Sequence, residues 1–279
     1  MKTIDLHVHS TYSDGTDTPA ELVAKAAKHG LSAIALTDHD TIDGVAEAVS
    51  AGKNQGLEVI PGVELSTFFD KKEIHIVGLC INYMSEALGK ELDSLRNVRT
   101  NRNELMCRRF QEIEIPVVYE ELLAAYPDAV LTRAHFADYL LVKGYVKSRN
   151  EAFERYIGSN GPCYVPRKKL DPAKAIKIIK EAGGIPVLAH PVLYHLGNES
   201  MTKLMDYLKD AGIAALEAIY STYSLGEELQ MRKLAARYNL LISGGSDYHG
   251  KNKPNIDIGK GRGHLAVPYS LLETLKSSL

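Results

Sequence analysis

Short apolar segments alternate with amphipathic helical segments along most of this chain, and this alternation constrains the fold more than any other feature. Residues 3–8, 31–37 and 57–65 are rich in Ile, Leu and Val, and patterns with helical spacing occupy residues 18–30 and 43–56 between them. Strands separated by helical segments of this length are typical of β-α-β units, in which the strands are parallel. The sequence therefore predicts an α/β fold built on a largely parallel sheet.

The ends of the predicted helices carry recognisable signals. Thr18 is placed to cap the first helix, with Pro19 at its first position and Glu21 completing a capping box. Asp171 and Pro172 repeat this arrangement later in the chain. About seven strand–helix units can be recognised in total, which predicts a distorted TIM-like (β/α)7 barrel.

The alternation stops near Asp93 and resumes after Lys169. Between these two points helical signals dominate, and 13 Lys and Arg residues outnumber 10 Asp and Glu residues. The whole chain has a formal net charge of −2, so the remainder is acidic. We therefore expect residues 1–92 and 170–279 to form the barrel, and residues 93–169 to form a small helical domain inserted into it as a cap.

The bulk composition excludes several classes of protein. The three cysteines form no CxxC pair, which argues against a disulfide framework or a structural zinc site and favours a reducing compartment. No apolar run approaches the roughly 18 residues that a membrane span requires. The near-neutral charge gives no general attraction for polyanions. We expect a cytoplasmic protein with no membrane association and no obligate protein partner.

Histidines and carboxylates gather at the predicted strand ends. Those at or just after an end are His7, His9, Asp14, His39, Glu64, His190, Asp247 and His249, and His75 lies within the fourth predicted strand. The carboxyl ends of parallel barrel strands meet at one mouth, so these side chains should converge there. A set of imidazoles and carboxylates without thiolates suits zinc, manganese or iron in an open hydrolytic site.

Two features of this set indicate how ions would be held. Residues at positions i and i+2 of a strand point to the same side, so His7 and His9 can bind one ion together. A carboxylate such as Glu64 can bridge two ions, which is the two-metal arrangement of phosphoester hydrolysis.

With these residues assembled, the sequence resembles the PHP (polymerase and histidinol phosphatase) superfamily. The matching motifs are "DLHVHSTYSDG", "ALTDHDT", "GVELS", "IHIVG", "LAHP" and "SGGSDYHG", and they extend over the whole predicted barrel. Together with "RAHFADYLLVKG" and "EAFERYIG", they are most similar to the bacterial branch of metal-dependent phosphoesterases. That branch includes 3′,5′-nucleotide bisphosphate phosphatases and 5′–3′ exonucleases that act on short RNA.

The resemblance implies two or three divalent ions of manganese, iron or zinc. The implied ligands of the first ion are His7, His9, Glu64 and Asp247, and those of the second are Asp14, His39 and His249. Glu64, His75 and His190 would hold a third ion where one is present. In members with two ions, His75 and His190 instead face the substrate phosphate, and both arrangements stay open here.

The resemblance also implies residues that contact the substrate. Arg133 and His135 match the basic pair near the phosphate, and Arg99 and Arg102 are added because they lie at helical spacing i and i+3. The predicted function is metal-dependent hydrolysis of a phosphomonoester by a metal-bridging hydroxide, with Asp247 or His190 as general base or acid. The predicted substrates are nucleotides such as 3′,5′-bisphosphates or the 5′ ends of short RNA.

Three alternatives remain at this point. A histidinol-phosphatase-like enzyme would perform the same chemistry on another substrate, and the helical insertion argues mildly against it. An amidohydrolase-type enzyme would typically bridge its metals with a carboxylated lysine, whereas here Glu64 occupies that place. A non-catalytic, nucleic-acid-associated PHP module would be expected to have lost ligands, and every motif here is filled.

Overall fold

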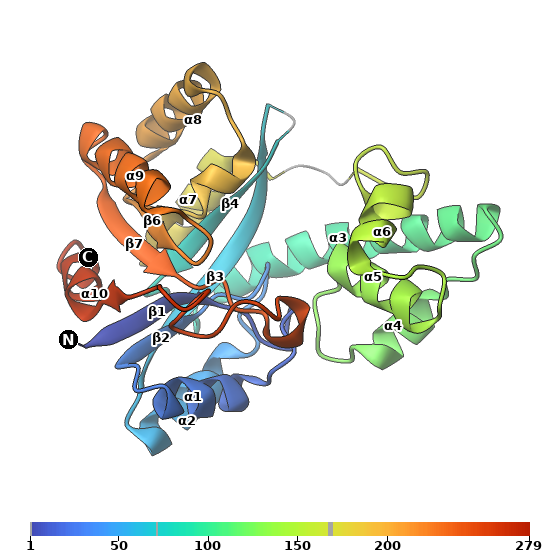
Figure 1. Cartoon of the computed structure of the whole chain (residues 1–279), viewed down its shortest axis with the longest axis horizontal. Helices are drawn as coiled ribbons and strands as arrows, with labels where there is room; N and C mark the ends of the chain where they lie inside the picture. Colours follow the sequence, from blue (N-terminus) through green and yellow to red (C-terminus); the bar gives the residue numbers. More distant parts are fainter. Residues whose placement is uncertain (1, 71, 167–169) are drawn as a thin grey trace.

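A curved β-sheet surrounded by helices forms the larger part of the molecule (Figure 1). The computed structural model describes residues 2–70, 72–166 and 170–279, and within them the sheet has eight strands in the order β7-β6-β5-β4-β3-β2-β1-β8. The strands are β1 (Thr3–Val8), β2 (Ala33–Leu36), β3 (Glu58–Phe69), β4 (Lys72–Leu79), β5 (Ile185–Leu188), β6 (Ala215–Tyr220), β7 (Leu241–Gly245) and β8 (Val267–Pro268). The helices around the sheet are α1 (Pro19–Lys28), α2 (Val45–Gln55), α7 (Pro172–Glu181), α8 (Asn198–Ala211), α9 (Leu225–Arg237) and α10 (Tyr269–Lys276).

The sheet curls until its first and seventh strands meet. Val8 at the end of β1 forms a parallel bridge with Tyr248, just beyond β7. The His9 N–H donates to the Tyr248 carbonyl oxygen over 2.9 Å, and the Asp247 N–H donates to the His7 carbonyl oxygen over 2.8 Å. These bonds nearly close the barrel at its mouth and confirm the predicted TIM-like α/β class.

Strand β4 departs from the predicted arrangement. It runs antiparallel to both of its neighbours, β3 and β5, whereas β1, β2 and β3 are parallel to one another. The sequence pattern predicted a largely parallel sheet and did not predict this antiparallel strand. The reason is the connection between β3 and β4, which is too short for a crossover and allows only a hairpin. The reversal places the first half of β4, including His75 opposite Ser66, at the mouth of the barrel.

The predicted helix ends are confirmed. The Thr18 side chain accepts from the Glu21 N–H, and the Glu21 carboxylate accepts from the Thr18 N–H, which is the reciprocal capping box. Asp171 accepts from the backbone N–H groups of the first turn of α7. Gly56 ends α2 with a φ of 66°, a left-handed conformation that glycine adopts without steric cost.

A group of helices projects from one side of the barrel, on the right in Figure 1. It comprises α3 (Glu86–Glu112), α4 (Tyr119–Ala125), α5 (Arg133–Val142) and α6 (Arg149–Ala152), followed by a π-helical turn (Phe153–Ile157). One hydrophobic cluster, running from Met106 to Val165 in the sequence, lies wholly within this group. Phe110 and Phe136 stack at its centre with their ring centroids 6.3 Å apart. The group therefore has a core of its own.

Helix α3 continues through the expected boundary at Asp93. Its first part packs on the barrel, because Leu88 and Leu92 belong to a barrel cluster. Its second part belongs to the helical group through Met106 and Phe110. The expected boundary at Lys169 lies outside the described residues. We propose that α3 joins two packing units rather than marking a sharp border between them.

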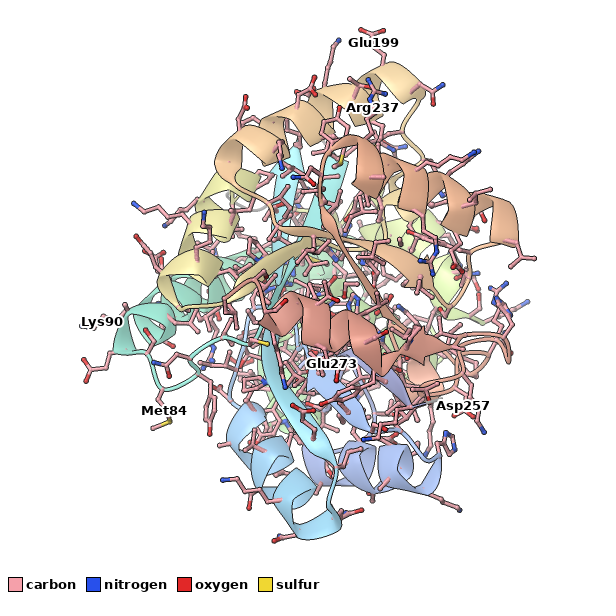
Figure 2. All side chains as sticks on the ribbon, turned by 90° about the vertical axis from the view of Figure 1, so that its left-hand side faces the viewer. Met84, Lys90, Glu199, Arg237, Asp257 and Glu273 are labelled. Carbon is pink, nitrogen blue, oxygen red and sulfur yellow. The ribbon has the colours of Figure 1, made fainter. Side chains whose placement is uncertain are left out.

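The opposite side of the barrel is covered by helix α10. Figure 2 views the molecule from this side and shows α10 lying across the barrel, with Glu273 labelled on it. Leu272 and Leu275 of this helix are fully buried in a barrel cluster that also contains Ile4 and Val267. In the part of the chain that the structure describes, no helix is both long enough and apolar enough to cross a membrane.

Because the helical group has its own hydrophobic core, we expect it to unfold independently of the barrel. Phe136→Ala should destabilise the group by about 3–5 kcal/mol, because it removes a fully buried aromatic side chain. Hydrogen exchange should then accelerate in residues 106–165 while β1 to β7 keep their protection. Val142→Ala, at an 82% exposed position on the same helix, is the matched control and should change stability by less than about 0.5 kcal/mol. Equal acceleration in both regions would show that they unfold as one unit.

Candidate metal centre

The nine predicted ligand side chains lie together at the mouth of the barrel. They come from the ends of β1, β2, β5 and β7 and from within β3 and β4, so strands distant in sequence supply one small volume. The loop after β1 is held against the end of β2 by Asp38, which accepts from the Ser10 N–H over 2.8 Å and from the Ser13 hydroxyl over 2.5 Å. A Cβ at Gly15 would lie 2.2 Å from the His9 carbonyl oxygen, so only glycine fits this turn.

Glu64 lies at the centre of the cluster and is contacted through both carboxylate oxygens. Its Oε1 lies 2.8 Å from His75 Nδ1 and 3.1 Å from His190 Nε2. Its Oε2 lies 3.0 Å from His39 Nδ1 and 3.3 Å from His9 Nε2. Glu64 is only 1% exposed. Its two oxygens therefore face different sets of histidines, which is the arrangement that a bridging carboxylate requires.

Two further carboxylates, those of Asp247 and Asp14, contact the histidines of the cluster. Asp247 Oδ1 lies 3.4 Å from His9 Nε2 and 3.7 Å from His7 Nε2. Asp14 Oδ1 lies 3.2 Å from His249 Nε2 and 3.8 Å from His39 Nε2. His9 belongs to the sets around both carboxylates, and His249 links them further, because its Nδ1 lies 3.3 Å from Asp247 Oδ1.

Ligand atoms of the predicted residues fall into four overlapping groups in which all atoms lie within 4.8 Å of one another. The groups are His7, His9 and Asp247; His9, Asp14, His39 and His249; His39, Glu64 and His75; and His7, Glu64 and His190. All nine predicted ligands belong to at least one group. The geometry places His75 and His190 in different groups, although both contact the same oxygen of Glu64.

The hydrogen bonding of these side chains fits a metal. Several buried ligand atoms of the described residues have no hydrogen-bond partner, namely His7 Nε2, His9 Nε2, Asp14 Oδ1, His39 Nδ1 and His190 Nδ1. Buried polar atoms are rarely left unsatisfied, because losing water without a replacement costs about 1–3 kcal/mol for each group. Divalent cations would satisfy these atoms, and imidazoles with carboxylates suit zinc, manganese or iron.

The pKa shifts show which protons compete with a cation. Burial and the neighbouring His249 lower the pKa of His9 well below its usual value, so that His9 is neutral and offers a lone pair. Burial also disfavours the charged form of His75, but the Glu64 carboxylate outweighs this effect and raises the pKa of His75 to about 10. A cation binding His75 must therefore displace a proton at neutral pH.

Glu217 is a site residue that the sequence analysis missed. Its Oε1 accepts from His7 Nδ1 over 3.0 Å, which directs the other ring nitrogen of His7 into the cluster. Its Oε2 accepts from the His190 N–H over 2.8 Å, at a residue whose φ of 29° is strained for a side-chain-bearing residue. One buried carboxylate therefore positions two predicted ligands. The signal was a lone acidic residue inside the apolar strand "IAALEAIY".

Asp247 is held from its other side by Tyr220 and Lys253, which were also missed. The Tyr220 hydroxyl donates to Asp247 Oδ2 over 2.6 Å, and Lys253 Nζ lies 2.5 Å from the same oxygen. Burial raises the pKa of Asp247, but Lys253 and the surrounding histidines outweigh it and hold the pKa well below its usual range. Asp247 therefore stays ionised, with Oδ1 directed at the histidines.

A cleft of about 170 Å³ opens between the cluster and the helical group. Asp14, His39 and His75 line one part of it, and the predicted substrate residues Arg99, Arg102 and Arg133 line another. Phe68, Phe153 and Tyr164 complete its wall together with smaller side chains.

Two of these arginines are held in place by carboxylates. Arg99 is buried and binds Asp40 through two nitrogens, with its Nε 2.7 Å from Asp40 Oδ2. Arg133 Nη2 donates to Glu73 over 2.9 Å. Arg99 and Arg102 are each only 6% exposed, so they do not form the solvated helix face that such spacing also suggests.

His135 occupies a different place from the arginines. It is 2% exposed, is not among the residues that line the cleft, and accepts from the Thr132 N–H through Nδ1 over 2.8 Å. Thr132 in turn donates from its hydroxyl to Asp14 Oδ2 over 3.2 Å. His135 thus connects the start of α5 to the metal cluster through Thr132.

Comparison with known proteins identifies the family. Residues 5–157 match the PHP domain. The chain is 36% identical to a 5′-3′ exoribonuclease of Haemophilus influenzae over 264 residues, which cover 92% of this chain and 96% of that protein. It is 33% identical to a 3′,5′-nucleoside bisphosphate phosphatase of Chromobacterium violaceum, over 93% of this chain and 91% of that protein.

The fold comparison agrees with the sequence comparison. A crystal structure described as that of a metal-dependent phosphoesterase from Bifidobacterium adolescentis superposes with a TM-score of 0.87 and 28% identity. The match covers 99% of this chain and 96% of the other. The predicted resemblance is confirmed, and the chain belongs to the PHP domain family.

Proposed function

We propose that this chain is a metal-dependent phosphoesterase that hydrolyses phosphate esters of nucleotides. The observation that carries this proposal is the cleft in which metal-ligand side chains lie on one part and three arginines on another. Arginine is suited to bind phosphate oxygens through its planar fork of donors. A phosphate bound in this cleft would therefore meet both the cations and the guanidinium groups. The relatives named as a nucleotide phosphatase and an exoribonuclease support the same chemistry.

The nine clustered side chains are proposed to hold two or three ions of manganese, iron or zinc. His7, His9 and Asp247 would hold one, and Asp14, His39 and His249 another, with Glu64 between them. When bound, the ions supply positive charge to the phosphoryl oxygens and lower the pKa of water toward neutrality. His75 and His190 would bind a third ion or the substrate phosphate.

Three side chains of the cleft are proposed to orient the phosphate. Asp40 fixes the guanidinium of Arg99, and Glu73 fixes that of Arg133, so little conformational freedom is lost when a phosphate binds. Arg102 lines the same cleft. Their charge would neutralise the equatorial oxygens as the bond to phosphorus changes. His135 would act indirectly, by positioning Thr132 against Asp14.

Proton transfer is proposed to involve Asp247 and His190. Asp247 is buried with Oδ1 directed at His7 and His9, and it would accept a proton from the attacking water. His190 contacts Glu64 through Nε2, and its Nδ1 is buried without a hydrogen-bond partner among the described residues. His190 would give a proton to the leaving oxygen. Glu217 would hold His190 in the required orientation through its backbone N–H.

Cleavage of the same type of bond would account for both the exoribonuclease and the bisphosphate phosphatase activity for which the two relatives are named. If the bond between phosphorus and the 3′ oxygen breaks, a 3′,5′-bisphosphate yields phosphate and a nucleoside 5′-monophosphate. The same cleavage at the first linkage of RNA yields a nucleoside 5′-monophosphate and a shortened chain. The leaving group is then the same in both reactions. Phe68, Phe153 and Tyr164 line the cleft and would contact its base.

The alternative functions predict different substrates. A histidinol-phosphatase-like enzyme would prefer a small amino alcohol phosphate, for which the aromatic wall of the cleft offers no specific purpose. An amidohydrolase-type enzyme would act on amides or lactones, yet Glu64 occupies the bridging place. A non-catalytic module would bind nucleic acid without releasing product.

The proposed function predicts metal-dependent release of phosphate or nucleotide. Protein loaded with manganese, iron or zinc should act on 3′,5′-bisphosphates and short 5′-phosphorylated RNA faster than on histidinol phosphate, an aryl phosphate or a lactone. Asp247→Ala should lower kcat/KM by roughly 10²–10⁴-fold, because it removes a proposed ligand and base. Asp210→Ala, at an exposed position on α8, is the matched control. Binding of short RNA without any product release would overturn the enzyme assignment.

Glu217→Gln tests the positioning of His7 and His190. The substitution keeps the shape of the side chain but removes the charge that orients the His7 ring, so metal affinity should fall roughly 10–100-fold. A competition titration against a chelating dye measures this loss, and circular dichroism checks that the barrel remains folded. Glu199→Gln, on the exposed face of α8, should leave the affinity within twofold. An unchanged affinity in Glu217→Gln would remove its assigned role.

A further inference from the structure

We call the cleft that is lined by Arg99, Arg102 and Arg133 the arginine cleft. A second cavity lies on another side of the metal cluster. Its volume is about 290 Å³, near the lower end of the range of roughly 300–1,000 Å³ typical of small-molecule sites. It is lined by the segment after β5, by the end of β6, and by the loop that joins β7 to β8. Figure 2 labels Asp257 in this loop, at the edge of the barrel. None of its lining residues also lines the arginine cleft.

Two side chains that line the second cavity also contact the metal cluster. Tyr220 and Lys253 both line it, and both contact Oδ2 of Asp247. The Tyr220 ring also lies against the His190 ring, with their centroids 5.7 Å apart. The proposed catalytic pair, Asp247 and His190, therefore lies directly behind one wall of this cavity.

The lining of the second cavity has the chemistry of a nucleotide site. Leu193, Pro254 and Ile256 provide apolar surface, and Lys253 and Arg262 provide positive charge. Asn255 adds an amide that can donate to and accept from a base edge. No Asp or Glu side chain belongs to the described residues that line it. Cations beside apolar surface, without carboxylates, favour an anionic ligand that also carries a flat apolar group.

The proposed reaction requires a further binding site when the substrate is a diester, because the nucleotide downstream of the attacked phosphorus has not been assigned one. Water adds its oxygen to phosphorus, the P–O3′ bond breaks with its electron pair on the 3′ oxygen, and that oxygen takes up a proton. In a 3′,5′-bisphosphate the phosphoryl group carries nothing further and leaves as phosphate. In RNA the same phosphoryl group carries the next nucleotide, which must lie beyond the metal cluster from the arginine cleft.

We propose that the second cavity binds this downstream nucleotide, so that Lys253 and Arg262 hold the phosphodiester on its 3′ side and Leu193 and Ile256 contact its base or sugar. The proposal rests on the proposed function, because it assigns the arginine cleft to the leaving nucleotide. It makes the chain an enzyme for short oligonucleotides as well as for bisphosphates. The cavity then determines selectivity between diester and monoester substrates.

Arg262→Ala tests this subsite through the ratio of two activities. The kcat/KM for cleavage of the first linkage of the 5′-phosphorylated trinucleotide pApApA is compared with that for adenosine 3′,5′-bisphosphate on the metal-loaded protein. We expect the ratio to fall about tenfold, because a charge-assisted contact with the downstream phosphodiester is lost. Lys260→Ala is the matched control, since Lys260 is exposed in the same loop and does not line the cavity. A ratio within twofold of wild type in Arg262→Ala would overturn the subsite.

A binding measurement separates failure of the subsite from failure of the proposed function. A pApApA analogue in which CH2 replaces the 3′ oxygen of the first linkage cannot be cleaved at that bond, and calorimetry gives its affinity independently of turnover. Wild-type protein should bind the analogue more tightly than a bisphosphate analogue with the same CH2 replacement, and Arg262→Ala should remove most of this difference. Equal affinities in the wild type would overturn the subsite, even if the bisphosphate is hydrolysed. Tight binding of the analogue together with no hydrolysis of pApApA or of the bisphosphate would instead contradict the proposed function alone.

Discussion

The buried carboxylate of Glu64 is the contact on which the rest of the site depends. Histidines from four different parts of the barrel lie within 3.3 Å of its two oxygens. Burial raises the pKa of this carboxyl, but His39 and His75 foremost hold it well below its usual range, so it remains charged. A charged group in this position is tolerable only while positive partners surround it. The barrel mouth is therefore built to hold cations around the central carboxylate of Glu64.

The surrounding structure supports this centre through a second layer of fixed contacts. Glu217 orients His7 and His190, while Tyr220 and Lys253 orient Asp247. Backbone strain occurs at the same places, because His190 and Asp247 both have positive φ values, 29° and 55°. Strain of this kind persists only where neighbouring contacts enforce it, and it is common at functional sites. The centre is therefore shaped by contacts within the protein itself.

The sequence predicted the barrel class and the gathering of nine polar side chains, because strand ends in an α/β barrel converge whatever the details of topology. It did not predict the reversal of β4, although the short link after "GVEL" excluded a parallel crossover. Glu217 and Tyr220 escaped notice because they sit inside an apolar strand and act through other residues. The pairing of Arg99 with Asp40 depends on a tertiary contact 59 residues apart, which no local pattern encodes.

The central claim is that Glu64 joins at least two ions at the barrel mouth. Anomalous diffraction from crystals of the manganese-loaded protein tests it most directly, because it locates each ion independently of activity. We expect at least two peaks, one about 2.0–2.2 Å from each carboxylate oxygen of Glu64, with His7, His9 and Asp247 around one and Asp14, His39 and His249 around another. A single ion bound without Glu64, or ions bound elsewhere on the chain, would contradict this account of the site.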